Sequence, residues 1–200
     1  MSLEISVSDL VTCKRYVETL PKPALKKGEQ IHKKIQEILY QKYWGEPEFK
    51  LQYTYPLDDE RSITIKGRVD FIDYQNKRII EIKPFYTKYY AEIQALMYYE
   101  IANLMGYRVE PYLLKYRVRN GKLKIEIARV YPIWGIIRNN IEKIYELAEK
   151  IDKGEQPRIK VMTCGNCPYR YNCRPEYIWI RKYNTWILAS PRELAMLETL

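Results

Sequence analysis

Two apolar stretches joined by a short turn constrain the fold of this chain more than any other feature of its sequence. They are Gly67–Asp73 and Ile79–Lys83, and the residues between them centre on Gln75-Asn76. This pattern predicts an antiparallel pair of β-strands joined by a turn. A turn centred on these two residues places Asp70 opposite Glu81, with their Cβ atoms about 5 Å apart on one face of the sheet.

The face that carries the two carboxylates differs from the opposite face. Because side chains alternate along a strand, Lys83 shares the face of Glu81, whereas the apolar side chains point to a core. Adjacent carboxylates repel each other, and a hard divalent cation removes the repulsion by taking both as oxygen ligands. An exposed strand with an ordinary Glu-x-Lys pair is the alternative. The core-facing residues are predicted to be Val69, Phe71, Ile80 and Ile82.

Three polar side chains on predicted helices add to this pattern. His32, the single histidine, lies beside the apolar stripe of a helix predicted over Leu25–Tyr43. Gln94 and Tyr98 are one turn apart on a helix predicted over Tyr89–Met105. They therefore share one face, where they can orient a phosphate or a catalytic side chain. A lone histidine is more often a surface residue or a satisfied core residue, and the Gln-Tyr pair carries no weight alone.

Apolar periodicity and turn signals predict the other elements and an α/β fold with a mixed sheet flanked by helices. We expect a single domain, 1–200, with an N-terminal helix in 1–24, a core in 25–155 and a cysteine-bearing end in 156–200. The predicted helices are Ser8–Leu20, Leu25–Tyr43, Tyr89–Met105, Trp134–Ile151 and a short one after Ser190, where Ser190 and Glu193 form a capping-box pattern. The predicted strands are Lys50–Leu57, Ser62–Asp73, Lys77–Lys83, Tyr107–Val118 and Lys122–Tyr131, and the hairpin signal Asn120-Gly121 joins the last two.

Composition bears on the partner and the location of the chain. A formal charge of +9 and a pI near 9.2 suit a polyanion such as nucleic acid, and surface solubility is the alternative explanation. The 20 tyrosines and 4 tryptophans can stack on unpaired bases, or they can be half-buried strand residues. No apolar run is long enough to span a membrane, and charged residues near the start argue against a secretory signal. We therefore expect a cytoplasmic protein without a membrane partner.

Four cysteines predict a second metal centre. Cys164, Cys167 and Cys173 lie within ten residues of one another, and Cys13 is far away in the sequence. Sites with four thiolate ligands often combine such a close group with a distant ligand, which would tie the two ends of the chain together. Zinc and an iron-sulfur cluster both fit this spacing, and two disulfides are a third alternative.

The ordered motifs resemble those of a known nuclease family. Gly28-x-x-x-His32, Gly67-x-x-Asp70, Glu81-x-Lys83 and Gln94-x-x-x-Tyr98 resemble the RecB-type branch of the restriction-endonuclease-like nucleases. With the four cysteines included, the chain is similar to the CRISPR-associated iron-sulfur exonuclease family. The resemblance extends from Cys13 to Cys173, which is most of the chain.

The resemblance implies roles for these residues. His32, Asp70 and Glu81, with the backbone carbonyl of Ile82, would bind Mn²⁺ or Mg²⁺. Lys83 would act in catalysis together with Asp70 and Glu81, supported by Gln94 and Tyr98. Cys13, Cys164, Cys167 and Cys173 would bind an iron-sulfur cluster, with 4Fe-4S favoured over 2Fe-2S and zinc as the alternative.

The resemblance also implies a substrate and partners. The expected activity is exonucleolytic digestion of single-stranded DNA, with trimming of DNA for CRISPR spacer acquisition and integrase proteins as partners. Residues 174–200 lie outside the motifs and carry Trp179 and Trp186. This segment can form a docking or homo-oligomer surface, although core packing is the commoner role of tryptophan. A non-catalytic, zinc-stabilised nucleic-acid-binding adaptor is the rival function, and the opposed carboxylates argue against it because they would repel DNA.

Overall fold

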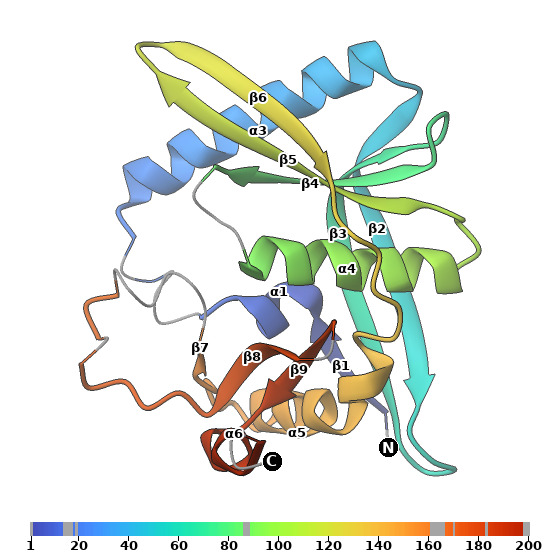
Figure 1. Ribbon diagram of the computed structural model, residues 1–200, viewed down its shortest axis with the longest axis vertical. Helices are drawn as coiled ribbons and strands as arrows, with labels where there is room; N and C mark the ends of the chain where they lie inside the picture. The colour runs from blue at the N-terminus through green and yellow to red at the C-terminus, as the bar shows by residue number, and fades with distance from the viewer. Residues whose placement is uncertain are drawn as a thin grey trace. The chain divides into compact units, whose positions relative to one another are not determined.

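The computed structural model describes residues 2–13, 18, 20–85, 89–160, 167–169, 171–182 and 184–197 (Figure 1). Two compact units divide the chain: the first comprises 1–19, 53–66 and 133–200, and the second comprises 20–52 and 67–132. Because β2 (Gly45–Pro56) and β3 (Ser62–Asp73) begin in one unit and end in the other, each unit contains part of both strands. The single domain expected from sequence stays a prediction.

The second unit contains a mixed sheet, as predicted. The second half of β3 pairs antiparallel with β4 (Arg78–Pro84), β4 pairs parallel with β5 (Glu110–Arg119), and β5 pairs antiparallel with β6 (Lys122–Arg129). The β5–β6 hairpin turns at Asn120-Gly121, both of which have positive φ. That geometry belongs to the tight hairpin turns that the Asn-Gly pair favours.

Helices cover both faces of this sheet (Figure 1). On one face, α3 (Lys22–Lys42) contributes Ile35 and Leu39 to a buried cluster with apolar residues of β3, β4 and β5. On the other face, α4 (Tyr89–Leu104) packs on β4 and β5. Because side chains alternate between the two faces of a strand, the residues of β4 that are not in the cluster point toward α4. The sheet residues of the cluster are Phe71, Ile80, Ile82, Leu114 and Tyr116, and they include three of the four predicted core-facing residues.

The first unit is built around α5 (Ile141–Asp152). This helix packs against β1 (Ser2–Ser6), which runs parallel to the first half of β3. Asn140, just before α5, is buried and donates to the carbonyl of Trp186 at 2.9 Å, and it accepts from the amide of Leu188 at 2.7 Å. These bonds tie the start of α5 to β9 (Thr185–Ala189).

Short strands and caps complete this unit. Here β8 (Tyr177–Lys182) pairs with both β9 and β7 (Ile159–Lys160). Next, α6 (Pro191–Leu197) begins at a capping box in which Ser190 and Glu193 bond reciprocally, as the sequence predicts. Trp186 is buried, and the indole N–H of Trp179 donates to the carbonyl of Leu10 at 2.7 Å. Both tryptophans therefore pack within this unit.

Several predicted boundaries are wrong. The helix predicted over Ser8–Leu20 is α1 (Val7–Val11), which ends at Thr12, a β-branched residue with an extended backbone. Residues 14–17 and 19 lie outside the described residues. The helix predicted from Trp134 begins only at Ile141, after Gly135 with a φ of +79° and a 3₁₀ turn, η1 (Arg138–Asn140). The sequence reasoning also missed β1, β7, β8 and β9.

Among the helices within the described ranges, none has the length and apolar character needed to cross a membrane.

Candidate nuclease active site

The predicted opposition of Asp70 and Glu81 follows from the observed strand register. Phe71 pairs with Ile80, and Ile72 pairs with Ile79, so the next positions along the ladder are Asp70 and Glu81. All the residues of the candidate site described below belong to the second unit. The sequence therefore predicted correctly how the two acidic side chains come together.

Two groups contact the carboxylate of Asp70. Its Oδ2 accepts a hydrogen bond from the backbone N–H of Ile82 at 2.6 Å, and its Oδ1 lies 3.7 Å from Nδ1 of His32 on α3. Burial by itself would raise the pKa of Asp70. The neighbouring His32 side chain and the charge of Lys83 outweigh burial, so the pKa of Asp70 lies below its usual value. Asp70 is therefore a carboxylate at neutral pH.

Glu81 and Lys83 form a buried ion pair beside Asp70. Glu81 Oε1 accepts from the Lys83 ammonium, and the Glu81 side chain is only 2% exposed. Burial, reinforced by the charge of Asp70, raises the pKa of Glu81 to about 8. For Lys83, burial favours the neutral amine, but the two carboxylates raise its pKa overall and keep it charged.

The second carboxylate oxygen of Glu81 differs from the first in its surroundings. This oxygen, Oε2, is buried and accepts no hydrogen bond from any residue within the described ranges. An unsatisfied buried carboxylate oxygen next to a second carboxylate is an unfavourable arrangement in a purely structural sheet. A divalent cation would satisfy the oxygen and remove the repulsion.

Gln94 and Tyr98 lie behind this group on α4. Gln94 Nε2 donates to the Tyr98 hydroxyl at 3.1 Å, and both side chains are buried. Burial, and then the charge of Glu81, raise the pKa of Tyr98, so its hydroxyl stays protonated. A Cβ added to Gly67 would lie 2.4 Å from Cε1 of Tyr98. The glycine of the Gly67-x-x-Asp70 motif therefore leaves room for the tyrosine ring.

An open groove of about 780 Å³ leads to Asp70. Gly28, one turn before His32 on α3, borders it, and a Cβ added there would meet nothing within 4 Å. The sequence reasoning missed Gln36, Glu48 and Arg68, which also line this groove. Only Gln36 had a local signal, because it follows His32 by one helical turn. The other lining residues are His32, Leu20, Ala24, Leu25, Glu29, Lys33, Pro84 and Tyr116.

The ligand set expected for the catalytic metal is only partly assembled. Across the described residues, no group of three or more His, Cys, Asp or Glu side chains is gathered in a way that could hold a metal ion. One of the expected ligands, Glu81, instead accepts from the Lys83 ammonium through Oε1. The unpartnered Oε2 of Glu81 and the ionised Asp70 nevertheless fit a divalent cation in charge and ligand type. The ligand roles of His32, Asp70, Glu81 and Ile82 stay predictions.

The cysteine site is described only in part. Cys13 and Cys167 are buried and Cys173 is half-buried. All three are free thiols, so no disulfide joins any two of them. Cys164 lies outside the described residues, and the four-cysteine cluster stays a prediction. Cys13 borders a small pocket together with Asp9, Thr12, Ile151, Glu155, Gln156 and Pro157.

Comparisons with known proteins agree with this geometry. A family model of the PD-(D/E)XK nuclease superfamily matches residues 13–174. In this chain Asp70 and Glu81-Ile82-Lys83 fit the acidic and Lys positions of the pattern in that name, whereas Val69 stands where the pattern has Pro. The crystal structure of SSO0001 matches with a TM-score of 0.53 and 17% identity over 85% of each chain. At this identity, the similarity concerns the fold alone. Among curated proteins, none matches this chain.

Proposed function

We propose that this chain, which belongs to the PD-(D/E)XK nuclease superfamily, is a divalent-metal-dependent exonuclease that acts on single-stranded DNA. Membership of the superfamily indicates hydrolysis of phosphodiester bonds with Mg²⁺ or Mn²⁺. The observation that carries the assignment of the site is the buried, unpartnered Glu81 Oε2 beside the ionised Asp70. A cation shared with a phosphodiester would satisfy both carboxylates at once.

The residues of the site have different roles in this proposal. When bound, Mn²⁺ or Mg²⁺ polarises the phosphate and activates water. His32, Asp70, Glu81 and the carbonyl of Ile82 would hold the ion. Because two carboxylates keep Lys83 charged, its ammonium suits the stabilisation of charge on phosphoryl oxygens better than the removal of a proton from water.

Gln94 and Tyr98 keep the reacting groups in place. The Gln94 amide donates to the Tyr98 hydroxyl, which burial and the charge of Glu81 keep protonated. Such supporting groups limit the movement of the residues that bind metal or substrate. Tyr98 is therefore a support for Glu81 in this proposal.

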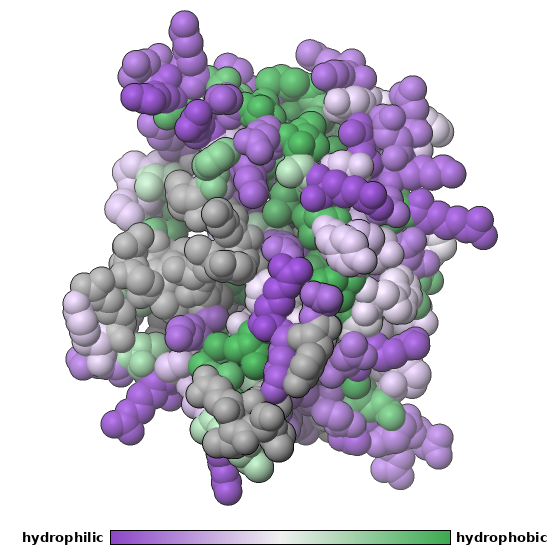
Figure 2. Space-filling model, viewed as in Figure 1, coloured by the Kyte–Doolittle hydropathy of each residue, from purple (hydrophilic) through white to green (hydrophobic). Residues whose placement is uncertain are grey.

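Support for single-stranded DNA comes from charge and from exposed aromatic rings. The formal charge is +9, and Lys33 and Arg68 border the groove that leads to Asp70. Trp44, Tyr40 and Tyr131 are more than half exposed, which leaves their rings accessible to unpaired bases. Hydrophilic side chains cover much of the surface visible in Figure 2. These features suit a polyanion whose bases are free to stack.

The cysteines and the family resemblance extend the proposal to the rest of the chain. Cys13, Cys164, Cys167 and Cys173 would bind an iron-sulfur cluster, 4Fe-4S in preference to 2Fe-2S. The nuclease would trim DNA for CRISPR spacer acquisition together with integrase proteins, in the cytoplasm. These assignments rest on the motif order and the cysteine spacing given above.

Replacement of Glu81 tests the catalytic centre. We expect Glu81→Ala to abolish Mn²⁺-dependent digestion of labelled single-stranded DNA while leaving DNA binding intact, because it removes the carboxylate with the unpartnered oxygen. Glu126→Ala, an exposed strand glutamate of the same unit, is the matched control and should digest DNA at the wild-type rate. Wild-type digestion by Glu81→Ala would refute the assigned centre.

The visible spectrum tests the cysteine site. We expect protein purified without oxygen to be brown, and its absorbance to bleach on reduction. Cys173→Ser should lose this colour, because a thiolate ligand is replaced by a poor one. A colourless protein with stoichiometric zinc would contradict the iron-sulfur assignment and leave the nuclease centre unaffected.

A further inference from the structure

Gln36 links α3 to the two strands beside the site. It follows His32 by one helical turn, and its side chain is buried with 7% exposure. The two hydrogens of its amide nitrogen have separate acceptors. Nε2 donates to Glu48 Oε1 of β2 at 2.7 Å and to the backbone carbonyl of Asp70 in β3 at 3.1 Å. One buried side chain therefore connects a helix to both strands.

Glu48 occupies an unusual backbone conformation at the other end of this link. Its φ is +56°, within a segment assigned to the strand β2. This left-handed conformation is costly for a residue with a Cβ, and it persists only where surrounding contacts maintain it. Gln36 holds one carboxylate oxygen, and Arg68 Nε holds the other at 2.6 Å. Strain of this kind is concentrated at functional sites.

The contacts of Asp70 show what the link accomplishes. On α3, His32 faces the carboxylate of Asp70, and Gln36 bonds the backbone carbonyl of the same residue. From β4, the N–H of Ile82 fixes Oδ2. Loss of the Gln36 bond would remove the contact that α3 makes with the main chain of Asp70, whereas His32 would still attract its side chain.

We propose that Gln36, supported by Glu48, is a positioning residue that sets the place of Asp70 relative to His32. This inference deepens the proposed function and rests on it for its role in metal binding. Gln36 touches neither substrate nor metal in this account. It acts through Asp70, so its removal should alter the site even before metal is added.

Hydrogen exchange of the metal-free protein provides the first test. The amide of Ile82 donates to Asp70 Oδ2, so its exchange rate reports how firmly Asp70 is held. We expect Gln36→Met to accelerate exchange at Ile82 by about tenfold, because the hydrogen bond to the Asp70 carbonyl is lost together with the one to Glu48. Gln30→Met, at an exposed glutamine of the same helix, is the matched control and should leave this rate unchanged. An unchanged rate in Gln36→Met would overturn the proposal.

A double variant that exchanges the side chains at 36 and 48 separates positioning of Asp70 from simple structural support. In the double variant Gln36→Glu/Glu48→Gln, the amide at 48 can donate to the carboxylate at 36, so the link between α3 and β2 is retained. The carbonyl of Asp70 still lacks its donor. We expect fast exchange at Ile82, as in Gln36→Met, although the link between α3 and β2 is retained. Slow, wild-type exchange in the swap would show that Gln36 is merely structural, and this variant also decides the matter if Gln36→Met does not fold.

Mn²⁺ titration by calorimetry then connects the link to the metal. We expect Gln36→Met and the swap to weaken Mn²⁺ binding by about tenfold, as the loss of an outer partner of a metal ligand does. Gln30→Met should bind as the wild type does. If the wild type binds no Mn²⁺, the proposed function fails, and the exchange measurements still decide whether Gln36 positions Asp70. Wild-type affinity in both Gln36 variants would overturn the positioning role.

Discussion

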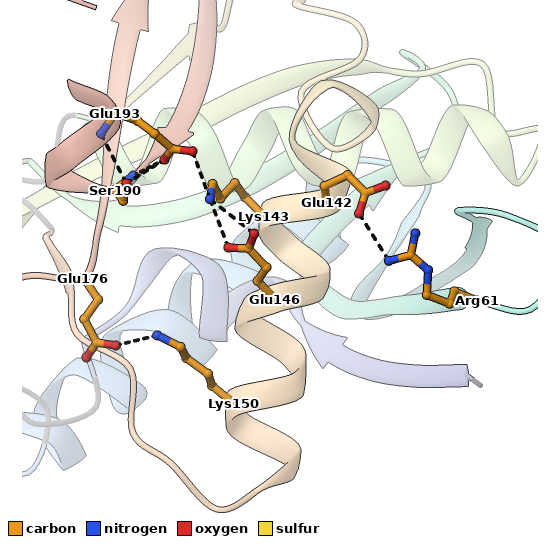
Figure 3. A network of polar contacts seen from close by, with 8 residues as sticks. All are labelled: Arg61, Glu142, Lys143, Glu146, Lys150, Glu176, Ser190 and Glu193. Atoms are coloured by element: carbon orange, nitrogen blue, oxygen red, sulfur yellow. Dashed lines mark hydrogen bonds and ion pairs between the residues drawn. The ribbon is translucent and has the colours of Figure 1, made fainter. Parts of the chain in front are cut away.

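The two compact units contain charged groups in contrasting surroundings. In the second unit, Asp70, Glu81 and Lys83 lie largely out of water, with two carboxylates for one ammonium. In the first unit, charged residues line α5 and the segments packed near it at the surface (Figure 3). There Lys143 bridges Glu146 and Glu193, and Lys150 pairs with Glu176 at 2.7 Å.

The pKa shifts differ in the same way. The pKa of Glu176 lies below its usual value, because its bonds with Lys150 and Arg158 outweigh burial. Both groups of the Lys150–Glu176 pair are thus stabilised in their charged forms. Glu81, by contrast, has its pKa raised to about 8 by burial and by Asp70. The surface pairs stabilise the charged forms of their side chains, whereas the site destabilises the charged form of Glu81. This is expected for a carboxylate that binds a cation.

The largest effect should come from neutralising Glu81. The pKa of Glu81 in the folded state is about 8, above its ordinary value of 4.5. The contribution of Glu81 to folding stability is therefore fully present below pH 4.5 and is lost as the pH rises through 8. Glu81→Gln removes this loss. Above the pKa of Glu81, we expect the metal-free variant to be roughly 2–4 kcal/mol more stable than the wild type in urea denaturation.

The control for this experiment is Glu126→Gln, at an exposed position in β6. It should follow the wild-type dependence of stability on pH. Parallel pH dependences in the wild type and in Glu81→Gln would show that Glu81 is not destabilised, and the contrast between the two units would disappear.

An intermediate effect is expected from Gly67→Ala. The added Cβ would lie 2.4 Å from the Tyr98 ring, which is buried and has little room to move. Overpacking of this kind costs about 1–3 kcal/mol, and the displaced ring would also disturb the support of Glu81. Thermal unfolding and the rate of DNA digestion should both fall. Gly28→Ala, where the new methyl group meets nothing within 4 Å, is the matched control, and equal stabilities of the two variants would contradict the tight contact.

The smallest effect should come from Glu176→Gln in the surface network. Because the folded-state pKa of Glu176 is lowered, its contribution is present above the ordinary value of 4.5 and is lost as the pH falls through the lowered pKa. We expect a loss of about 0.5–1 kcal/mol at neutral pH that vanishes in acid and shrinks in high salt. Urea denaturation at both pH values measures it. If Glu176→Gln lost as much stability as Glu81→Gln gains, solvent and salt would not screen the surface ion pairs.

Local patterns predicted the regular elements of the second unit well. The pairing of β3 with β4 followed from the turn at Gln75-Asn76, and the β5–β6 hairpin followed from Asn120-Gly121. The boundaries of α4 were predicted to within one residue. The first unit was predicted less well, because β1, β7 and β9 have two to five residues each and show too few alternations to identify.

The sequence by itself determined which faces of the strands are acidic and which helix carries His32, since periodicity along one segment encodes both. Only the tertiary structure decided that Gln36 and Glu48 meet beside Asp70, because those contacts join α3, β2 and β3 across intervals that no local pattern spans. It also decided that Glu81 lies out of water with a raised pKa. Desolvation depends on the atoms that surround a side chain, and distant parts of the chain supply most of them.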